Sequence, residues 1–86
     1  MWDWDEAKRQ ANLAKHGVDF ALAEDLAWTD ATTEPDIRRD YGEDRFKSTG
    51  SIGERLYVLI YTPRGERRRL ISLRKANLRE IDKWLT

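Results

Sequence analysis

The chain has 86 residues with no cysteine and a single histidine, which excludes disulfides and thiolate metal sites and argues against a structural zinc site. The acidic N-terminus lacks the form of a secretion signal, and the longest apolar run, residues 56–61, is too short to cross a bilayer. We therefore expect one cytoplasmic domain over residues 1–86, with no metal, no cofactor and no membrane contact.

The net charge of zero conceals an uneven distribution along the chain. Residues 1–44 carry twelve acidic and five basic side chains, whereas residues 45–86 carry four acidic and eleven basic ones. Such a split predicts either a surface that binds a polyanion or two halves that attract each other in the fold.

The N-terminal segment has the apolar spacing of a helix over residues 5–16. Asp3 or Asp5 can cap its start and Gly17 suits a left-handed position just past its end. One stripe of apolar side chains at helical spacing is expected to face the core: Trp4, Ala7, Ala11, Ala14 and Val18. A second short helix, from Phe20 to about Trp28, follows a cap at Asp19, so the two helices are expected to form a helix–turn–helix corner.

The remaining residues predict a sheet followed by a terminal helix. Thr32 to Glu34 can form a short edge strand, and the acidic stretch to residue 44 is expected to be a loop. Alternating apolar residues and turn signals predict strands over 45–52, 55–62 and 67–74, joined as an antiparallel meander. Residues 75–85 place Leu78, Ile81 and Leu85 at helical spacing, for packing on the sheet. The predicted class is α+β.

Several motifs now point to a family. The stretches "WDEAKRQANLAKHGVDF" and "ERLYVLIYTPRGERRRLISLRKA" contain W-D-x-x-K, N-x-x-K-H-G-V, Y-T-x-R and R-x-I-S-x-R-x-A in one order. Over nearly its whole length the chain resembles the BrnT toxins of bacterial type II toxin–antitoxin pairs. Two departures are visible: Leu73 stands where the family usually has alanine, and Trp84 stands where a tyrosine is usual.

The resemblance implies a RelE-like fold and a toxin that cleaves RNA as an endoribonuclease and inhibits translation. It also implies a cognate BrnA-like antitoxin, through which the pair can assemble further on operator DNA. Two alternatives stay open. The basic half could serve a non-catalytic RNA- or protein-binding module, or the first two helices could bind DNA, although their acidic half would repel phosphates.

A metal-free ribonuclease needs cations for the phosphate, a base for the 2′-hydroxyl and an acid for the leaving oxygen. We favour Arg64 and Arg74 as catalytic cations, and expect RNA contacts from four further side chains: Lys15, Arg45, Arg69 and Lys75. Strand alternation places Arg68 and Arg74 on one face and Arg69 on the other, so these arginines cannot all line one groove. The alternative is an ordinary solvated strand edge whose charges discourage aggregation.

Two further candidates have equally good structural explanations. Tyr61, and Tyr57 on the same strand face, can stack on RNA bases or fill the core. His16 lies at a helix end, where the helix dipole favours a protonated imidazole. It is therefore either a charged helix cap or a catalytic group, for which the protonated form suits a general acid.

Overall fold

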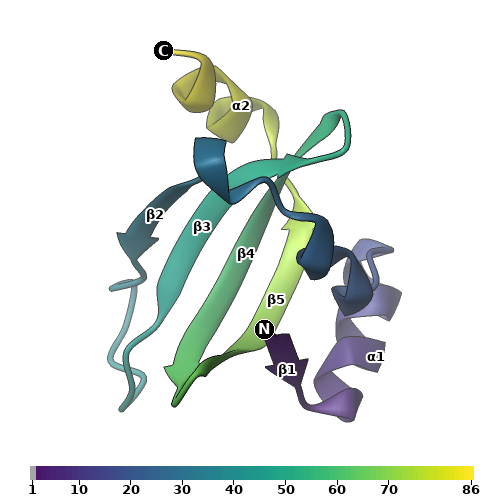
Figure 1. Cartoon of the computed structure of the whole chain (residues 1–86), viewed down its shortest axis with the longest axis vertical. Helices are drawn as coiled ribbons and strands as arrows, with labels where there is room; N and C mark the ends of the chain where they lie inside the picture. The colour runs from purple at the N-terminus through teal and green to yellow at the C-terminus, as the bar shows by residue number, and fades with distance from the viewer. Residues whose placement is uncertain (1) are drawn as a thin grey trace.

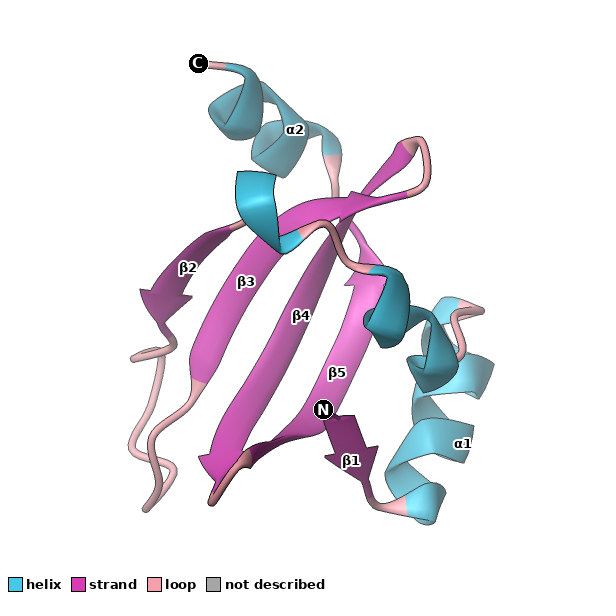
Figure 2. Cartoon of the chain, in the orientation of Figure 1, coloured by secondary structure: helices cyan, strands magenta, loops and turns pink. Residues whose placement is uncertain are grey.

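The computed structural model describes residues 2–86. Two α-helices, two 3₁₀ segments and five strands follow one another in this part of the chain: β1 (Trp2–Trp4), α1 (Glu6–His16), η1 (Phe20–Asp25), η2 (Trp28–Asp30), β2 (Thr32–Pro35), β3 (Phe46–Ile52), β4 (Arg55–Arg64), β5 (Arg67–Lys75) and α2 (Leu78–Leu85). The strands form one sheet in the order β1-β5-β4-β3-β2, with η1 and η2 across one face and α2 at one end (Figures 1 and 2). The predicted α+β class is confirmed.

The sheet is mixed, not a plain antiparallel meander. β2, β3, β4 and β5 are antiparallel neighbours, and β2 is an edge strand as predicted. The prediction missed β1, which adds to β5 in parallel, from Trp2 beside Arg68 to Trp4 beside Leu70. Strand β1 has only three residues and is followed directly by Asp5, the cap of α1, so it is too short to show the sequence pattern of a strand. β1 is held by tertiary contacts, including a hydrogen bond from the Trp2 indole N–H to the Ala23 carbonyl.

Helix α1 begins and ends as predicted, but it turns a different face to the protein. Asp5 accepts the N-terminal backbone N–H groups, and Gly17 has a φ of 70° at the C-terminal end. The predicted stripe of alanines is wrong, because the alanines at positions 7, 11 and 14 are exposed. The buried residue of α1 is Asn12, whose amide donates to the Leu73 and Val18 carbonyls and accepts from the Leu73 N–H.

The Asn12 contact explains how a polar helix packs against the sheet. Strand β1 covers the edge of β5 only as far as Leu70, so the backbone of Leu73 has no strand partner on that side. The Asn12 amide takes the place of a strand residue there, with one donor and one acceptor. The contact holds α1 against β5 and directs the C-terminal turn of α1 toward the sheet.

The second predicted helix forms only a 3₁₀ segment. Asp19 caps it as expected, accepting from the Ala21 N–H. Phe20, Ala23 and Leu26 are buried, at the three-residue spacing that brings side chains of a 3₁₀ turn into line. Because α1 is followed directly by a 3₁₀ segment and not by an α-helix, the predicted helix–turn–helix corner is absent from residues 2–86.

The main hydrophobic core lies on one face of the sheet, which we call the core face. It joins Leu59, Tyr61, Leu70 and Leu73 of the sheet to the 3₁₀ segments and Trp2. The opposite face carries a smaller cluster around Val58 and Ile60. We call this second face the basic face, because of the side chains described below.

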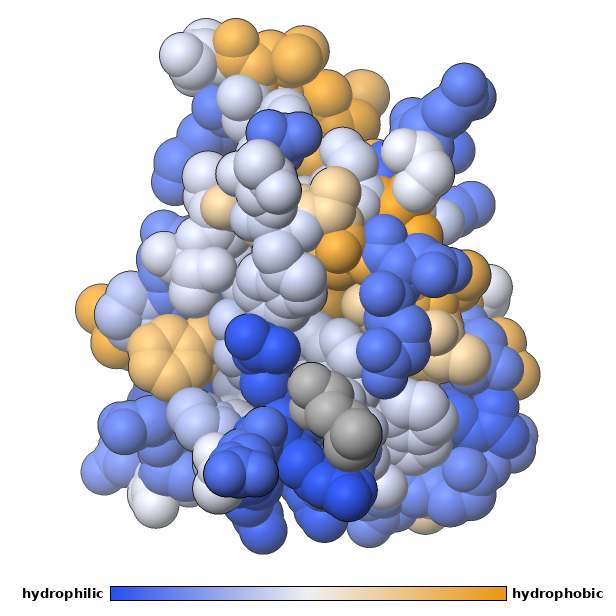
Figure 3. All heavy atoms as spheres, viewed as in Figure 1, coloured by the Kyte–Doolittle hydropathy of each residue, from blue (hydrophilic) through white to orange (hydrophobic). Residues whose placement is uncertain are grey.

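The C-terminal helix is less firmly packed than predicted. It begins at Leu78, because Asn77 and Glu80 form a capping box that starts the helix there. Ile81 packs on the smaller cluster, but Leu78 and Leu85 are 80% and 75% exposed. Figure 3 shows apolar surface at the α2 end of the molecule. Over residues 2–86, no helix has the length and apolar character to span a membrane.

Candidate functional site

An irregularity in β5 decides which arginines share a face. Ile60 pairs with Ser72 but the next residue, Tyr61, pairs with Leu70, so Ile71 is an extra residue in β5. This bulge reverses the alternation beyond it. The prediction that Arg68 and Arg74 share a face is therefore wrong.

The contacts of the three arginines confirm this reversal. Arg68 lies on the core face, with its guanidinium 4.4 Å from the centre of the Trp28 ring. Arg69 lies on the basic face, where its Nε is 3.3 Å from an oxygen of Asp3 in β1. Arg74 lies beyond the bulge on that same face, paired with Glu80 of α2.

A pocket of about 620 Å³ opens on the basic face, and we call it the basic pocket. The end of α1, the loop after β2, and strands β3 and β5 all contribute side chains to it. Six of these are cationic or can become so: Lys15, His16, Arg38, Arg45, Lys47 and Arg74. Carboxylates are present too, from Glu34 and Asp36, and the floor is formed by Ile60, Ile71 and Ser72. Residues far apart in the sequence thus converge on one cationic hollow.

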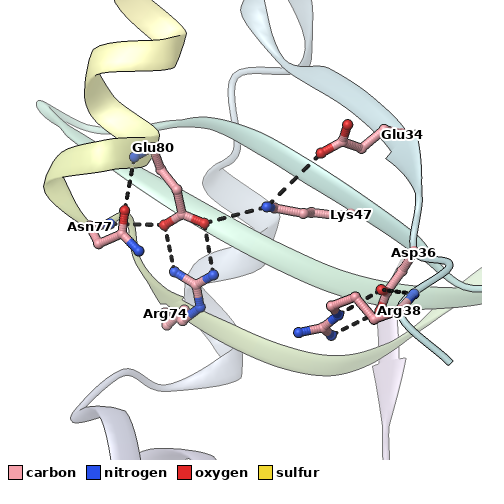
Figure 4. A network of polar contacts seen from close by, with 7 residues as sticks. All are labelled: Glu34, Asp36, Arg38, Lys47, Arg74, Asn77 and Glu80. Atoms are coloured by element: carbon pink, nitrogen blue, oxygen red, sulfur yellow. Dashed lines mark hydrogen bonds and ion pairs between the residues drawn. The ribbon is translucent and has the colours of Figure 1, made fainter.

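Glu80 lies beside the pocket and contacts two of its cations, Arg74 and Lys47 (Figure 4). Arg74 donates two hydrogen bonds to its carboxylate, of 2.7 and 2.8 Å, and the backbone N–H of Asn77 donates a third of 2.9 Å. Lys47 Nζ is 3.4 Å from Glu80 and 4.0 Å from Glu34. The hydrogen bonds from Arg74, together with the nearby cations, hold the pKa of Glu80 at about 2, so this carboxyl is ionised at neutral pH. The Arg74 fork is thereby fixed in position.

The loop after β2 forms the opposite wall. The Asp36 carboxylate is buried and accepts from the Arg38 guanidinium at 2.7 and 2.9 Å and from the Tyr41 hydroxyl at 3.2 Å. These hydrogen bonds, led by those from Arg38, lower the pKa of Asp36. Arg45 stacks over the Tyr41 ring at 3.9 Å and bonds Glu43 at 3.0 Å. The wall is therefore a set of mutually fixed charged groups.

His16 is the one imidazole of the chain, and it lines this pocket. Partial burial lowers its pKa below the usual 6.5, and the charges of Lys15 and Arg74 lower it further. At neutral pH the ring is therefore mainly uncharged. The helix dipole favours the protonated form, whereas desolvation and the two neighbouring cations oppose it. A neutral imidazole can accept a proton, as a general base does.

The structure brings together only some of the site residues predicted from the sequence. Lys15, His16, Arg45 and Arg74 all line the basic pocket. The others lie elsewhere. Arg64 ends β4 in an exposed turn, 3.8 Å from Glu43. Arg69 pairs with Asp3, and Lys75 is exposed at the end of β5, across from Tyr57 on the core face.

Tyr61 lies on the core face and not in the basic pocket. Its side chain is 6% exposed and packs edge-on against Trp2. Its hydroxyl is 2.8 Å from Ser48 Oγ, so the polar end of the ring is satisfied inside the protein. Tyr61 and Arg64 therefore lie outside the basic pocket.

Two cationic residues of the pocket, Arg38 and Lys47, were not predicted, and neither was Glu80, which pairs with Arg74 beside it. Lys47 is two residues beyond Arg45 in a strand, so alternation alone places the two on one face. Glu80 gave no comparable signal, because its partners depend on where α2 begins and on the bulge in β5. Arg38 comes from a loop whose path the sequence does not specify.

Comparison with known proteins places the chain in a family. The family described as "Ribonuclease toxin, BrnT, of type II toxin-antitoxin system" matches residues 4–80 of the chain. No curated protein matches it. The family match favours a ribonuclease over the non-catalytic binding module considered from the sequence.

Proposed function

Since the chain belongs to the BrnT family of ribonuclease toxins of type II toxin–antitoxin systems, we propose that the basic pocket is where it binds and cleaves RNA. Family membership implies an RNA substrate and a cognate antitoxin. The observation that carries the proposal is the convergence of four cationic side chains on the chain's one imidazole, from three separate parts of the fold: Lys15, Arg45, Lys47 and Arg74.

The cations account for binding of the phosphate. Arg74 contacts the planar carboxylate of Glu80 with two N–H donors of its guanidinium. The same two-donor geometry suits a phosphate equally well. Lys47 adds a point charge beside Arg74, and Lys15 approaches from α1. An RNA phosphate that enters the pocket therefore meets charges from both sides.

His16 supplies the base. Its neutral imidazole takes the proton from the 2′-hydroxyl, and the resulting oxygen attacks the adjacent phosphorus. The bond from phosphorus to the 5′ oxygen breaks, and that oxygen takes a proton from an ammonium group, for which Lys15 and Lys47 line the same pocket. The fixed cations stabilise the charge that develops on the phosphate oxygens, usually the largest contribution to catalysis. The mechanism calls for no metal ion.

A role for His16 as a helix cap has less support. The end of α1 is already closed by Gly17, whose N–H donates to the Leu13 carbonyl at 2.8 Å. A neutral imidazole gains little from the helix dipole, because that interaction requires positive charge. The lowered pKa of His16 thus favours the catalytic role.

We further infer that the antitoxin is BrnA-like and covers the basic pocket with acidic and apolar side chains. The exposed Leu78 and Leu85 offer apolar area at the two ends of α2, the helix that carries Glu80. Assembly on operator DNA would then run through the antitoxin. The RelE-like character of the fold remains an expectation from the family.

The chemistry of the cut ends tests the mechanism. Purified protein should cleave a labelled RNA to a 2′,3′-cyclic phosphate and a 5′-hydroxyl, at an undiminished rate in excess chelator. Fragments that carry 3′-hydroxyl and 5′-phosphate ends, or a rate that collapses in chelator and returns with a divalent ion, would overturn it.

A further inference from the structure

A second hollow, of about 360 Å³, lies between α2 and the strands β2 and β3. Glu34 and Lys47 line both this hollow and the basic pocket, so the two are adjacent. A chain whose phosphate lies at Arg74 and Lys47 can place its neighbouring base in the second hollow. We propose that this hollow binds a nucleobase, guanine by preference, next to the phosphate that is cleaved. The proposal rests on the assignment of cleavage to the basic pocket.

Trp84 provides a surface on which a base can stack. Trp2, Trp4 and Trp28 each pack against another aromatic ring, and Trp84 is the one tryptophan of residues 2–86 that does not. Its side chain lines the hollow and is only partly buried. Bases splayed out of single-stranded RNA commonly stack on such a ring. Aromatic packing in the core therefore does not explain why a tryptophan stands at position 84.

Glu34 provides the means to tell bases apart. Its carboxylate is 55% exposed, and its one ion pair, with Lys47, is long at 4.0 Å, so both oxygens can accept hydrogen bonds. Guanine presents two adjacent N–H donors, N1–H and N2–H, on its Watson–Crick edge, which match a two-oxygen acceptor. Adenine and cytosine present an amino group beside an acceptor nitrogen, and uracil presents one N–H between two carbonyls. A carboxylate in this position favours guanine.

The test is to map the cuts that the protein makes in RNA of random sequence. The wild type should enrich guanine at one position beside the cut. Trp84→Ala should lower the cleavage rate about 5- to 100-fold at limiting RNA, the usual loss for one stacked base. Trp84→Phe should recover most of that loss. Glu34→Gln should flatten the guanine preference, because the rate at guanine sites falls toward the rate at the other bases. Asp82→Ala, exposed on the same helix and outside the hollow, is the matched control.

Two results separate failure of this inference from failure of the proposed site. If Arg74→Ala abolishes cleavage while Trp84→Ala and Glu34→Gln keep the wild-type rate and base preference, only the nucleobase site is overturned. If Arg74→Ala cuts at the wild-type rate, the basic pocket itself is wrong and the inference falls with it. Thermal melts of each variant show that it is folded, and Glu34, on an exposed edge strand, gives a variant with little risk to folding.

Discussion

Asn12 and His16 are polar residues that lie one turn apart on α1. Asn12 has a structural role, and His16 has the proposed catalytic role. Both face the sheet from the same side of the helix. Asn12 is 7% exposed and its amide is fully engaged with backbone groups. His16 lines the basic pocket as an uncharged ring. Asn12 therefore holds the helix in the position that brings His16 to the phosphate.

Asn12→Ala should lower the free energy of unfolding by about 2–4 kcal/mol, because it leaves buried backbone groups of Leu73 and Val18 without partners. The measurement is a urea melt followed by circular dichroism. Gln10→Ala, exposed on the same helix, is the control and should change the value by about 0.5 kcal/mol or less. Equal midpoints for the two variants would show that the Asn12 contacts contribute nothing.

His16→Ala should lower single-turnover cleavage by about 10²- to 10⁴-fold while the protein stays folded. In the wild type, the rate should rise with pH as the imidazole loses its proton, through a pKa below 6.5, and level off at higher pH. A rate that falls over that pH range would identify the imidazolium as an acid instead. A destabilised variant with wild-type turnover would make His16 a helix cap.

At the scale of elements, the sequence predicts the long, strongly patterned segments and fails where tertiary contacts decide. Helix α1 and strands β3, β4 and β5 follow from apolar periodicity and turn residues. Strand β1 and the 3₁₀ form of η1 do not, because each is fixed by packing on a sheet that its own residues cannot specify. The bulge at Ile71 has no signature in the sequence, yet it decides that Arg74 shares a face with Arg69 and not with Arg68. For this reason only part of the candidate site could be predicted.

The ion pair between Glu80 and Arg74 joins α2 to β5, and its contribution to stability should depend on pH. The folded protein holds the pKa of Glu80 at about 2, below its ordinary value of 4.5. The pair therefore stabilises the fold above about pH 4.5, and this stabilisation is lost as the pH falls toward 2. Glu80→Gln should lower the free energy of unfolding by about 1–2 kcal/mol at pH 7.

Urea melts from pH 7 to pH 2.5 test this dependence. The difference between wild type and Glu80→Gln should shrink as the pH falls, since the wild-type carboxyl becomes protonated. Glu54→Gln, in the exposed turn between β3 and β4, is the matched control and should follow the wild type throughout. A difference that stays constant over the whole range would show that charge on Glu80 is not what joins the two elements.

For the molecule as a whole, a net charge of zero is compatible with RNA binding because six cationic or titratable basic side chains gather in one pocket. Cations from both halves of the sequence converge on the basic face. Acidic groups there, such as Asp36 and Glu80, are tied to arginines in ways that fix the geometry of the cations. The sequence suggested a polyanion-binding surface from the charge split alone. In the folded protein, acidic residues from the first half of the sequence also form part of the walls of the basic pocket.

The antitoxin should protect this face. In hydrogen exchange on the toxin–antitoxin complex, protection gained on binding should fall on residues 34–38, 71–75 and α2, since a partner that blocks RNA must cover the cations that bind it. The free toxin is the reference. Protection gained only over residues 2–30 would show that the antitoxin neutralises the toxin without covering the basic pocket.

Single-turnover cleavage of one labelled RNA at saturating protein, compared across three arginine variants, tests the central claim most directly. Arg74→Ala removes the cation that the bulge brings into the basic pocket, and should lower the rate by about 10²-fold or more. Arg55→Ala, at the exposed start of β4 and outside the basic pocket, should cleave as the wild type does. Arg64→Ala should lower the cleavage rate by no more than the loss of one peripheral phosphate contact would. A folded Arg74→Ala protein that cleaves normally, beside an Arg64→Ala protein that does not, would place the active site at the turn between β4 and β5 and contradict this account.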